Sequence, residues 1–510
     1  MQKFIFSLAL ATIVSLFTAV AAQADLLFGF GDSLVDNGNI SRLTGQNIPP
    51  SPPYLQNRFS NGPTFVEYLP KLLSLHADSS IVYGTGYNLA VGGAESGSKN
   101  FLNPLLPGLV SEINLFSSLG RRFESRDLAI VWAGANDYFD LTTQIQNGAI
   151  PLTQLRTVGL NAMNQTTSNL ADAAMRLADL GVKRMVFANL PDLGKIPQLS
   201  GTPLLSAPAT QLTDAHNQQL ESKLARVHAQ TGANIILFDA NLVFKRILAD
   251  PAKYGFSNVT DAAINTVAMS TSQSAQNTYL FWDNAHPTTA GHLLLARYIV
   301  NMVEAPSLLA SQIQLMTYGS RAFADLIYSQ LTSYAGEKQG VLPSSEGKMV
   351  TYSGKGVVVP PPPNAVATPN NRTQIFLLGG FRQGQRADRS NSVGFNYYLG
   401  NVALGAQYTF NSLISAGALL GYGYNKSDLN EGQGHIDVNA YQVGGFLNFH
   451  GQNWCVGGIA AYGFNEHDSK RHGILGDTIT GSPNGHMVIL GTKGGYFWRF
   501  GDFAVGPTGD

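Results

Sequence analysis

Two segments near opposite ends of the first 300 residues carry side chains that could transfer an acyl group. The first is FGFGDSLVDNGN, in which an apolar run leads into a turn that contains Ser33. The second is FWDNAHPTTAGH, in which Asp283 stands three residues before His286. At that spacing both side chains can face one direction, so the carboxylate can orient the imidazole while the imidazole takes a proton from a serine hydroxyl. A serine activated in this way can attack a carbonyl carbon.

Two further segments offer hydrogen-bond donors for the negative charge that such an attack creates. In NLAVGGAES, adjacent glycines let a backbone N–H approach a ligand closely. In VWAGANDYF, Asn136 follows a strand-like run and can offer its side-chain amide. Each signal is weak alone, because a serine after a strand is usually a helix cap and an asparagine in a loop usually forms a turn. The four segments together favour acyl transfer.

Other histidines have simpler interpretations. His292, close behind His286, opens the apolar helix GHLLLARYIV and is expected to be a surface or packing residue. The remaining candidates have no partner motif: His76, His216 and His228. No cluster of His, Cys and Asp has the spacing of metal ligands, the chain has one cysteine, and no glycine-rich phosphate loop follows a strand. We therefore expect no metal and no cofactor.

The elements around these segments indicate an α/β domain. Short apolar runs alternate with helical patterns, and strands are expected at 26–30, 128–133, 185–188 and 234–238. One helix is predicted at 161–180, with Gly181 at the position of a C-terminal cap. Such alternation predicts a parallel sheet with helices on both faces, and reacting groups gather at the carboxyl ends of its strands.

The order of the four segments and the residues in them resemble the GDSL, or SGNH, family of esterases and lipases. The resemblance covers about residues 26 to 303 and implies a three-layer sandwich around a parallel sheet. It implies that Ser33 is the nucleophile and that Asp283 and His286 complete the triad. It also implies an oxyanion hole made of the Ser33 amide, Asn136 and Gly93, with Gly92 as the less favoured glycine.

The second half of the chain has a different pattern of apolar residues. Apolar positions at helical spacing predict a connecting helix over 307–331, and periodicity is then lost over 336–371, where prolines 360–363 indicate an extended spacer or a loop. From Thr373 apolar residues alternate at period two, as in NVALGAQYTF and YQVGGFLNF. Strands of about ten residues with one apolar face, many glycines and terminal aromatics favour a transmembrane β-barrel. A soluble β-sandwich is the alternative.

This half resembles the translocator barrel of autotransporters. The resemblance implies a barrel in the outer membrane, a helix in its pore and a passenger exposed at the cell surface. The barrel would contact outer-membrane lipid and depend on the outer-membrane assembly machinery. About seven or eight strands are expected, fewer than such barrels contain, and we therefore expect the barrel in this sequence to be truncated.

Bulk properties agree with a secreted two-domain protein. A chain of 510 residues exceeds one hydrophobic core, and 32 basic against 33 acidic side chains leave no charge excess for binding nucleic acid. Lys3, an apolar run and Ala22-Gln23-Ala24 predict a cleaved signal peptide. We expect the signal peptide at 1–24, the hydrolase at 25–305, a linker with the connecting helix at 306–372 and the partial barrel at 373–510.

The sequence therefore predicts a cell-surface carboxylester hydrolase that forms an acyl-enzyme on an ester with an acyl chain. Three other substrates keep the same site: a lysophospholipid, a thioester or an acetylated sugar. A surface binding or adhesion module is the alternative from another class. Acyl length, leaving alcohol, oligomeric state and release of the passenger stay open.

Overall fold

The computed structural model describes residues 26–510, apart from 74–87, 121, 125–126, 267–271, 338–350, 353–355, 358–371, 388–392, 412, 452, 474–477, 497, 501–502, 506–507 and 510. The expected signal peptide, His76 and prolines 360–363 lie outside the described residues. The chain divides into two compact units, Met1–Val303 and Glu304–Asp510. They are called the N-terminal and the C-terminal unit below.

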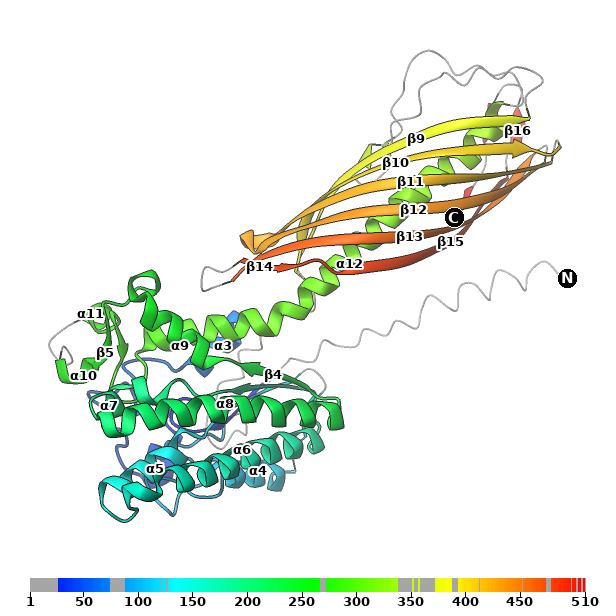
Figure 1. Ribbon diagram of the computed structural model, residues 1–510. Coiled ribbons are helices and arrows are strands. Elements are labelled where there is room, and N and C mark those ends of the chain that lie inside the picture. The colour runs from blue at the N-terminus through cyan, green and yellow to red at the C-terminus, as the bar shows by residue number, and fades with distance from the viewer. Residues whose placement is uncertain are drawn as a thin grey trace. The chain divides into compact units, whose positions relative to one another are not determined.

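A parallel sheet forms the centre of the N-terminal unit (Figure 1). Its strands lie in the order β1 (Leu27–Gly31), β2 (Leu128–Trp132), β3 (Arg184–Ala188) and β4 (Asn234–Phe238). These strands coincide with the four predicted runs to within a residue at each end, and the predicted α/β class is confirmed. Every position of β1 and β2 is buried, as strands covered on both faces require.

Three helices cover one face of this sheet: α4 (Leu109–Ser118), α6 (Leu155–Asp179) and α8 (Pro203–Thr231). Their apolar side chains form one buried cluster with the phenylalanines of β1 and β3. Helix α6 begins earlier than predicted but ends where the sequence places its end. The residue after its cap, Gly181, has a φ of 104°, a left-handed conformation that glycine adopts without strain.

The opposite face is covered by α3 (Phe65–Leu72) and by the first turns of α12 (Thr289–Glu337). The ring of Trp132 in β2 lies 5.4 Å from that of Phe65 and 5.7 Å from that of Phe238, centroid to centroid. Two helical layers thus enclose the sheet, which is the three-layer sandwich that the resemblance implies.

The other elements of this unit are short. Strands β5 (Asn258–Ala262) and β6 (Tyr279–Phe281) form a separate two-stranded parallel sheet. The remaining helices are α2 (Asn39–Thr44), α5 (Ala135–Gln146), α7 (Pro197–Ser200), α9 (Ala240–Ala249), α10 (Ala263–Thr266) and α11 (Gln273–Gln276). There are also 3-10 turns, among which are η1 (Leu152–Gln154), η2 (Leu193–Lys195) and η3 (Pro251–Tyr254).

Helix α12 is longer than the sequence predicts. Instead of a separate connecting helix from about Ser307, one helix of 49 residues runs from Thr289 to Glu337, and the division between the units falls inside it. The apolar helix that begins near His292 and the predicted connecting helix are therefore one element. No helix among the described residues combines the length and apolarity needed to cross a bilayer.

An antiparallel sheet of long strands makes up most of the C-terminal unit (Figure 1). Its long strands are β9 (Thr373–Arg386), β10 (Phe395–Thr409), β11 (Ile414–Leu429), β12 (Gly434–His450), β13 (Trp454–His472) and β15 (Asn484–Tyr496). The short strands of this sheet are β7 (Thr351–Tyr352), β8 (Gly356–Val357), β14 (Thr478–Gly481) and β18 (Thr508–Gly509). Two further short strands, β16 (Trp498–Phe500) and β17 (Phe503–Val505), pair with each other in a separate sheet. Within the described residues the sheet is open, with β18 at one end and β7 at the other.

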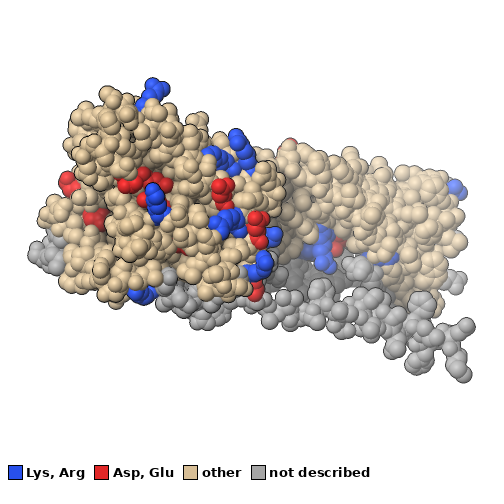
Figure 2. Space-filling view, turned by 90° about the horizontal axis from the view of Figure 1, so that it is seen from below, with Lys and Arg blue, Asp and Glu red and all other residues tan. Residues whose placement is uncertain are grey.

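The two faces of this sheet differ as the alternation predicts. Leu404 is 57% exposed on the outer face, whereas its neighbour Ala403 is buried on the inner face. Helix α12 lies against the inner face, where Phe323 occupies the space beside Gly421. On the face that Figure 2 shows, few Lys, Arg, Asp or Glu side chains lie over these strands.

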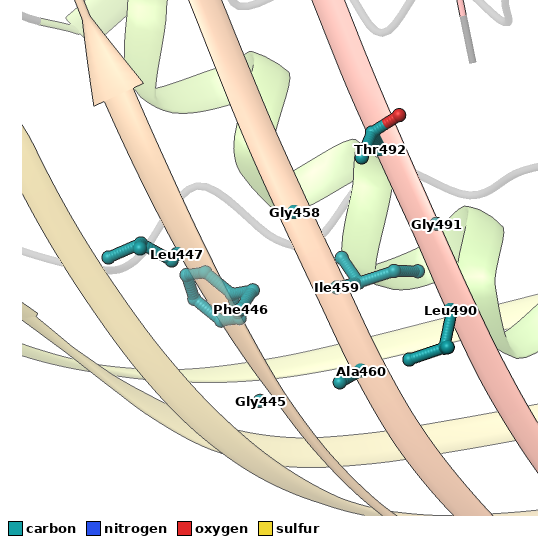
Figure 3. Close-up of a pocket in the computed structure, with 9 residues that line it drawn as sticks. All are labelled: Gly445, Phe446, Leu447, Gly458, Ile459, Ala460, Leu490, Gly491 and Thr492. Atoms are coloured by element: carbon teal, nitrogen blue, oxygen red, sulfur yellow. The ribbon is translucent and has the colours of Figure 1, made fainter.

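Small residues leave a shallow apolar depression on the sheet (Figure 3). Gly458 pairs with Leu447, and Ala460 pairs with Leu490, so the leucines flank positions with little or no side chain. All four positions point away from α12. The depression is therefore part of the apolar outer face.

Candidate active site

The end of β1 places Ser33 at the carboxyl edge of the main sheet. Gly31, the last residue of the strand, has a φ of 128°, and a Cβ there would lie 1.9 Å from the Trp132 carbonyl oxygen. Only glycine therefore allows the chain to turn at this point. The next amide, of Asp32, donates to the Trp132 carbonyl at 3.0 Å, which fixes the start of the turn that carries Ser33.

The turn after β6 brings His286 and Asp283 to the same edge. The two oxygens of Asp283 lie 2.8 and 2.7 Å from His286 Nδ1, and the Ser33 hydroxyl lies 2.7 Å from Nε2. An ionised carboxylate only accepts hydrogen bonds, so Nδ1 carries the proton and Nε2 is free to accept the serine proton. The structure thus joins, across 253 positions of sequence, the three side chains predicted to form the triad.

Electrostatics in this chain favour a basic imidazole. Burial opposes the charge on His286, but the charge and hydrogen bond of Asp283, together with the charge of Asp32, raise the pKa of the imidazole above its ordinary value. Burial likewise works against ionisation of Asp283, yet His286 and two backbone amides hold the pKa of that carboxyl below its usual range. Asp32 differs, because burial raises its pKa to about 7.

The expected oxyanion donors lie on two adjoining segments. The Gly92 N–H donates to Asp36 Oδ2 at 2.7 Å and is already engaged. Among the described residues no acceptor is found for the N–H of Gly93 or of Ser33. Asn136, in the first turn of α5, donates from Nδ2 to the Ala94 carbonyl at 3.0 Å and keeps its second N–H. This geometry favours Gly93 over Gly92 as the donor.

Sequence reasoning missed two residues that contact the triad. The Tyr54 hydroxyl donates to Asp283 Oδ2 at 2.8 Å, and the ring of Phe59 lies 5.0 Å from that of His286, centroid to centroid. Both come from the loop before α3, which carries no motif and has no fixed sequence distance from Asp283. The proximity of a tyrosine and a phenylalanine to two prolines in PPYLQNRF is no signal of such a role.

Two other histidines are buried and uncharged. His292 is fully buried against Phe65, with neither ring nitrogen hydrogen-bonded, and burial lowers its pKa to about 3. It is the packing residue that the sequence allowed, and not a surface residue. Burial also lowers the pKa of His216 to about 3, and Tyr138 contacts its Nδ1 at 2.7 Å. Within the described part of the chain no three His, Cys, Asp or Glu side chains are grouped as metal ligands would be.

Comparison with known families agrees with this geometry. Residues 27–299, more than half of the chain, match the model of the GDSL-like Lipase/Acylhydrolase family, and residues 376–510 match the Autotransporter beta-domain. The chain belongs to the GDSL-like lipase/acylhydrolase family and carries an autotransporter β-domain behind the family domain. Its predicted class, an ester-bond hydrolase, is confirmed at this level.

Several curated proteins are similar to the chain. Phosphatidylcholine-sterol acyltransferase from Aeromonas hydrophila is 28% identical over 325 residues, which cover 54% of this chain and 89% of that protein. Thermolabile hemolysin from Vibrio parahaemolyticus is 25% identical, covering 56% and 65%, and esterase EstA from Pseudomonas aeruginosa is 26% identical, covering 60% and 45%. The chain thus spans less than two thirds of the hemolysin and less than half of EstA.

One solved structure resembles part of the chain. The translocator domain of autotransporter NalP from Neisseria meningitidis is 16% identical, covers 35% of this chain and 53% of its own, and has a TM-score of 0.24. The assignment of the C-terminal unit depends on the family model and on its strands.

Proposed function

We propose that the chain is a carboxylester hydrolase that works through an acyl-enzyme on Ser33. The observation that carries the proposal is the continuous set of contacts from the Ser33 hydroxyl through His286 to Asp283. The pKa directions support the same roles, since the carboxyl stays ionised and the imidazole becomes a stronger base.

The contacts suggest the order of the reaction. Ser33 Oγ attacks the ester carbonyl carbon while His286 Nε2 takes the hydroxyl proton. The negative charge on the carbonyl oxygen is held by the amides of Ser33 and Gly93 and by the Asn136 side chain. His286 then gives its proton to the leaving alcohol, and a water molecule activated by the same nitrogen releases the acid and restores the serine.

We further propose that this site stands at the cell surface. The support is the autotransporter β-domain after the family domain and the apolar outer face of its strands. Outer-membrane lipid would contact that face, and insertion would need the outer-membrane assembly machinery. Protease added to intact cells should remove the ester hydrolase activity, whereas activity confined to the periplasm would contradict this location.

The nucleophile is tested by Ser33→Ala. The variant should lose ester hydrolysis while it keeps the fold by circular dichroism, and an organophosphonate should label the wild type on Ser33 alone. Activity that survives the substitution would remove the central claim. A protein that binds cells or surfaces and never hydrolyses a chromogenic ester would instead be an adhesion module.

A substrate panel tests the chemical class. p-Nitrophenyl esters of increasing chain length, a lysophospholipid, an acyl thioester and an acetylated sugar present four different groups to one site. The highest kcat/KM identifies the class, and carboxylesters are expected to lead.

A further inference from the structure

The oxyanion loop, residues 91–96, is held by carboxyl groups from three separate segments, and two of these groups, those of Asp36 and Glu112, are buried. Asp36, before α2, accepts the Gly92 amide at 2.7 Å, and Asp137 of α5 accepts the Ser96 amide at 2.9 Å. Glu112 of α4 accepts the Val91 amide at 3.1 Å. Among these three, Glu112 alone lies outside the four segments that suggest the chemistry.

Glu112 also accepts an amide from the other side of the site. Its Oε2 receives the Gly31 N–H at 2.7 Å, while Oε1 receives that of Val91. Gly31 stands two residues before Ser33, and Val91 stands two residues before Gly93. The Val91 N–H also donates to the Gly31 carbonyl at 3.0 Å, so the two segments that lead to the oxyanion amides are joined directly and, a second time, through the Glu112 carboxyl group.

The surroundings of Glu112 are costly for a carboxyl group. The residue is 1% exposed, and its helix neighbours Leu109, Ile113 and Phe116 belong to the apolar core. Burial raises the pKa of Glu112 well above its usual value, although the two amides work in the opposite direction. An apolar side chain would suit this core better but would leave the buried Gly31 N–H without an acceptor. The Val91 N–H would keep only the Gly31 carbonyl, to which it also donates at 3.0 Å.

We propose that Glu112 is a positioning residue that sets the distance and angle between the Ser33 and Gly93 amides. This proposal rests on the proposed function, because it concerns the oxyanion hole of that reaction. The two oxygens of Glu112 position the segments by accepting hydrogen bonds. The number of acceptor oxygens therefore matters more for this role than the charge of the carboxyl group. Misplaced donors weaken binding of the tetrahedral intermediate and not of the substrate, so the effect belongs to kcat.

The test compares Glu112→Leu with Glu112→Gln in the full chain, with active sites counted by organophosphonate titration. Glu112→Leu should lower kcat about 10- to 100-fold, less than the roughly 100- to 1,000-fold loss that follows removal of an oxyanion donor, because the donors are misplaced and not removed. KM should change less than about threefold. Glu112→Gln keeps one acceptor oxygen and should recover most of the lost kcat. Affinity for a boronic acid, which binds as a tetrahedral adduct, should fall in parallel with kcat.

A matched control separates positioning from stability. Leu177→Ala creates a cavity in the same apolar core, away from the oxyanion loop, and should lower the melting temperature without changing kcat per active site. A Glu112→Leu protein with normal kcat per active site, or with an equal loss in Leu177→Ala, would overturn the proposal. A wild-type chain without any hydrolysis would instead contradict the proposed function.

Discussion

The triad in this protein has an additional hydrogen bond at its far end. Asp283 accepts from His286 on one side and from the Tyr54 hydroxyl on the other. Burial, and then the adjacent carboxylate, raises the pKa of Tyr54 beyond the range where it would ionise, so the phenol stays a donor. A donor to a carboxylate spreads its charge and fixes its orientation. Tyr54 is therefore expected to tune the imidazole through Asp283.

Removing that donor should change the pH profile. In Tyr54→Phe the negative charge of Asp283 concentrates on His286, so the pKa of the imidazole should rise and the acid limb of kcat/KM should move to higher pH. Loss of a hydrogen bond to a charged group should also lower kcat roughly tenfold. Tyr68→Phe is the control, because Tyr68 bonds to Thr289 at 2.6 Å and not to the triad. An identical pH profile in both variants would contradict the role of Tyr54.

The two histidines at positions 286 and 292 should behave very differently. His286→Ala should lose several orders of magnitude in kcat, because an unassisted serine hydroxyl is a poor nucleophile near neutral pH. His292→Ala should lower the melting temperature, since the side chain is buried, and should change kcat little. Steady-state kinetics on both variants decide this, and the reverse ranking would show that the wrong histidine has been assigned.

Residues with a motif could be predicted, and residues without one could not. Ser33, Asp283 and His286 were predicted because their order and spacing are characteristic. Glu112 and Tyr54 act through contacts between segments that only the fold brings together, and in the sequence each looks like an ordinary helix or loop residue. For Gly93 over Gly92, the sequence offers only the family resemblance, and the contact of the Gly92 amide with Asp36 adds a physical reason for that preference.

At the scale of elements, glycines of the C-terminal sheet make room for the side chains of α12. A Cβ on Gly421 would lie 2.1 Å from the ring of Phe323, and one on Gly491 would lie 1.9 Å from the Tyr328 hydroxyl. The period-two pattern predicted the strands and their faces. The sequence did not predict that the apolar helix near His292 and the connecting helix are one element, α12. Apolar positions at helical spacing predict a helix but do not show whether two such runs are continuous.

The outer face provides the test of membrane insertion. Arginine in place of Leu404, which is 57% exposed, should cost about 2–4 kcal/mol if this face meets hydrocarbon near the bilayer midplane. Leu404→Met is the control, since it keeps the side chain apolar. The measurement is the urea concentration that unfolds the chain in lipid vesicles. Equal midpoints for the two variants would show that this face does not contact lipid.

At the scale of the whole molecule, the N-terminal unit has its own core and should fold alone. The sheet between two helical layers buries its apolar residues within this unit. Residues 25–305, expressed without the rest, should be soluble and should keep the kcat of the full chain. Aggregation of this fragment, with activity restored by the C-terminal unit, would show that the two parts depend on each other.

Buried histidines should make that fragment sensitive to acid. The folded-state pKa of His292 is about 3, below its ordinary value near 6.5, so its contribution to stability is intact above pH 6.5 and declines as pH falls below that value. His292→Leu removes this proton uptake. Between pH 6.5 and 5, wild type should lose roughly 1.5 kcal/mol more free energy of unfolding than the variant, by urea titration. An equal loss of unfolding free energy in the wild type and the variant would show that His292 is not buried in its neutral form.

The long sequence separation between Ser33 and His286 has a consequence for export. The nucleophile comes from the turn after the first strand of the N-terminal unit, and the base comes from the turn just before α12. If the unit crosses a membrane as proposed, a chain halted partway holds its nucleophile and its base in different compartments and cannot react. Hydrolysis of an ester that cannot cross the membrane would then come only from molecules whose N-terminal unit has been fully exported. The activity would therefore measure completed secretion.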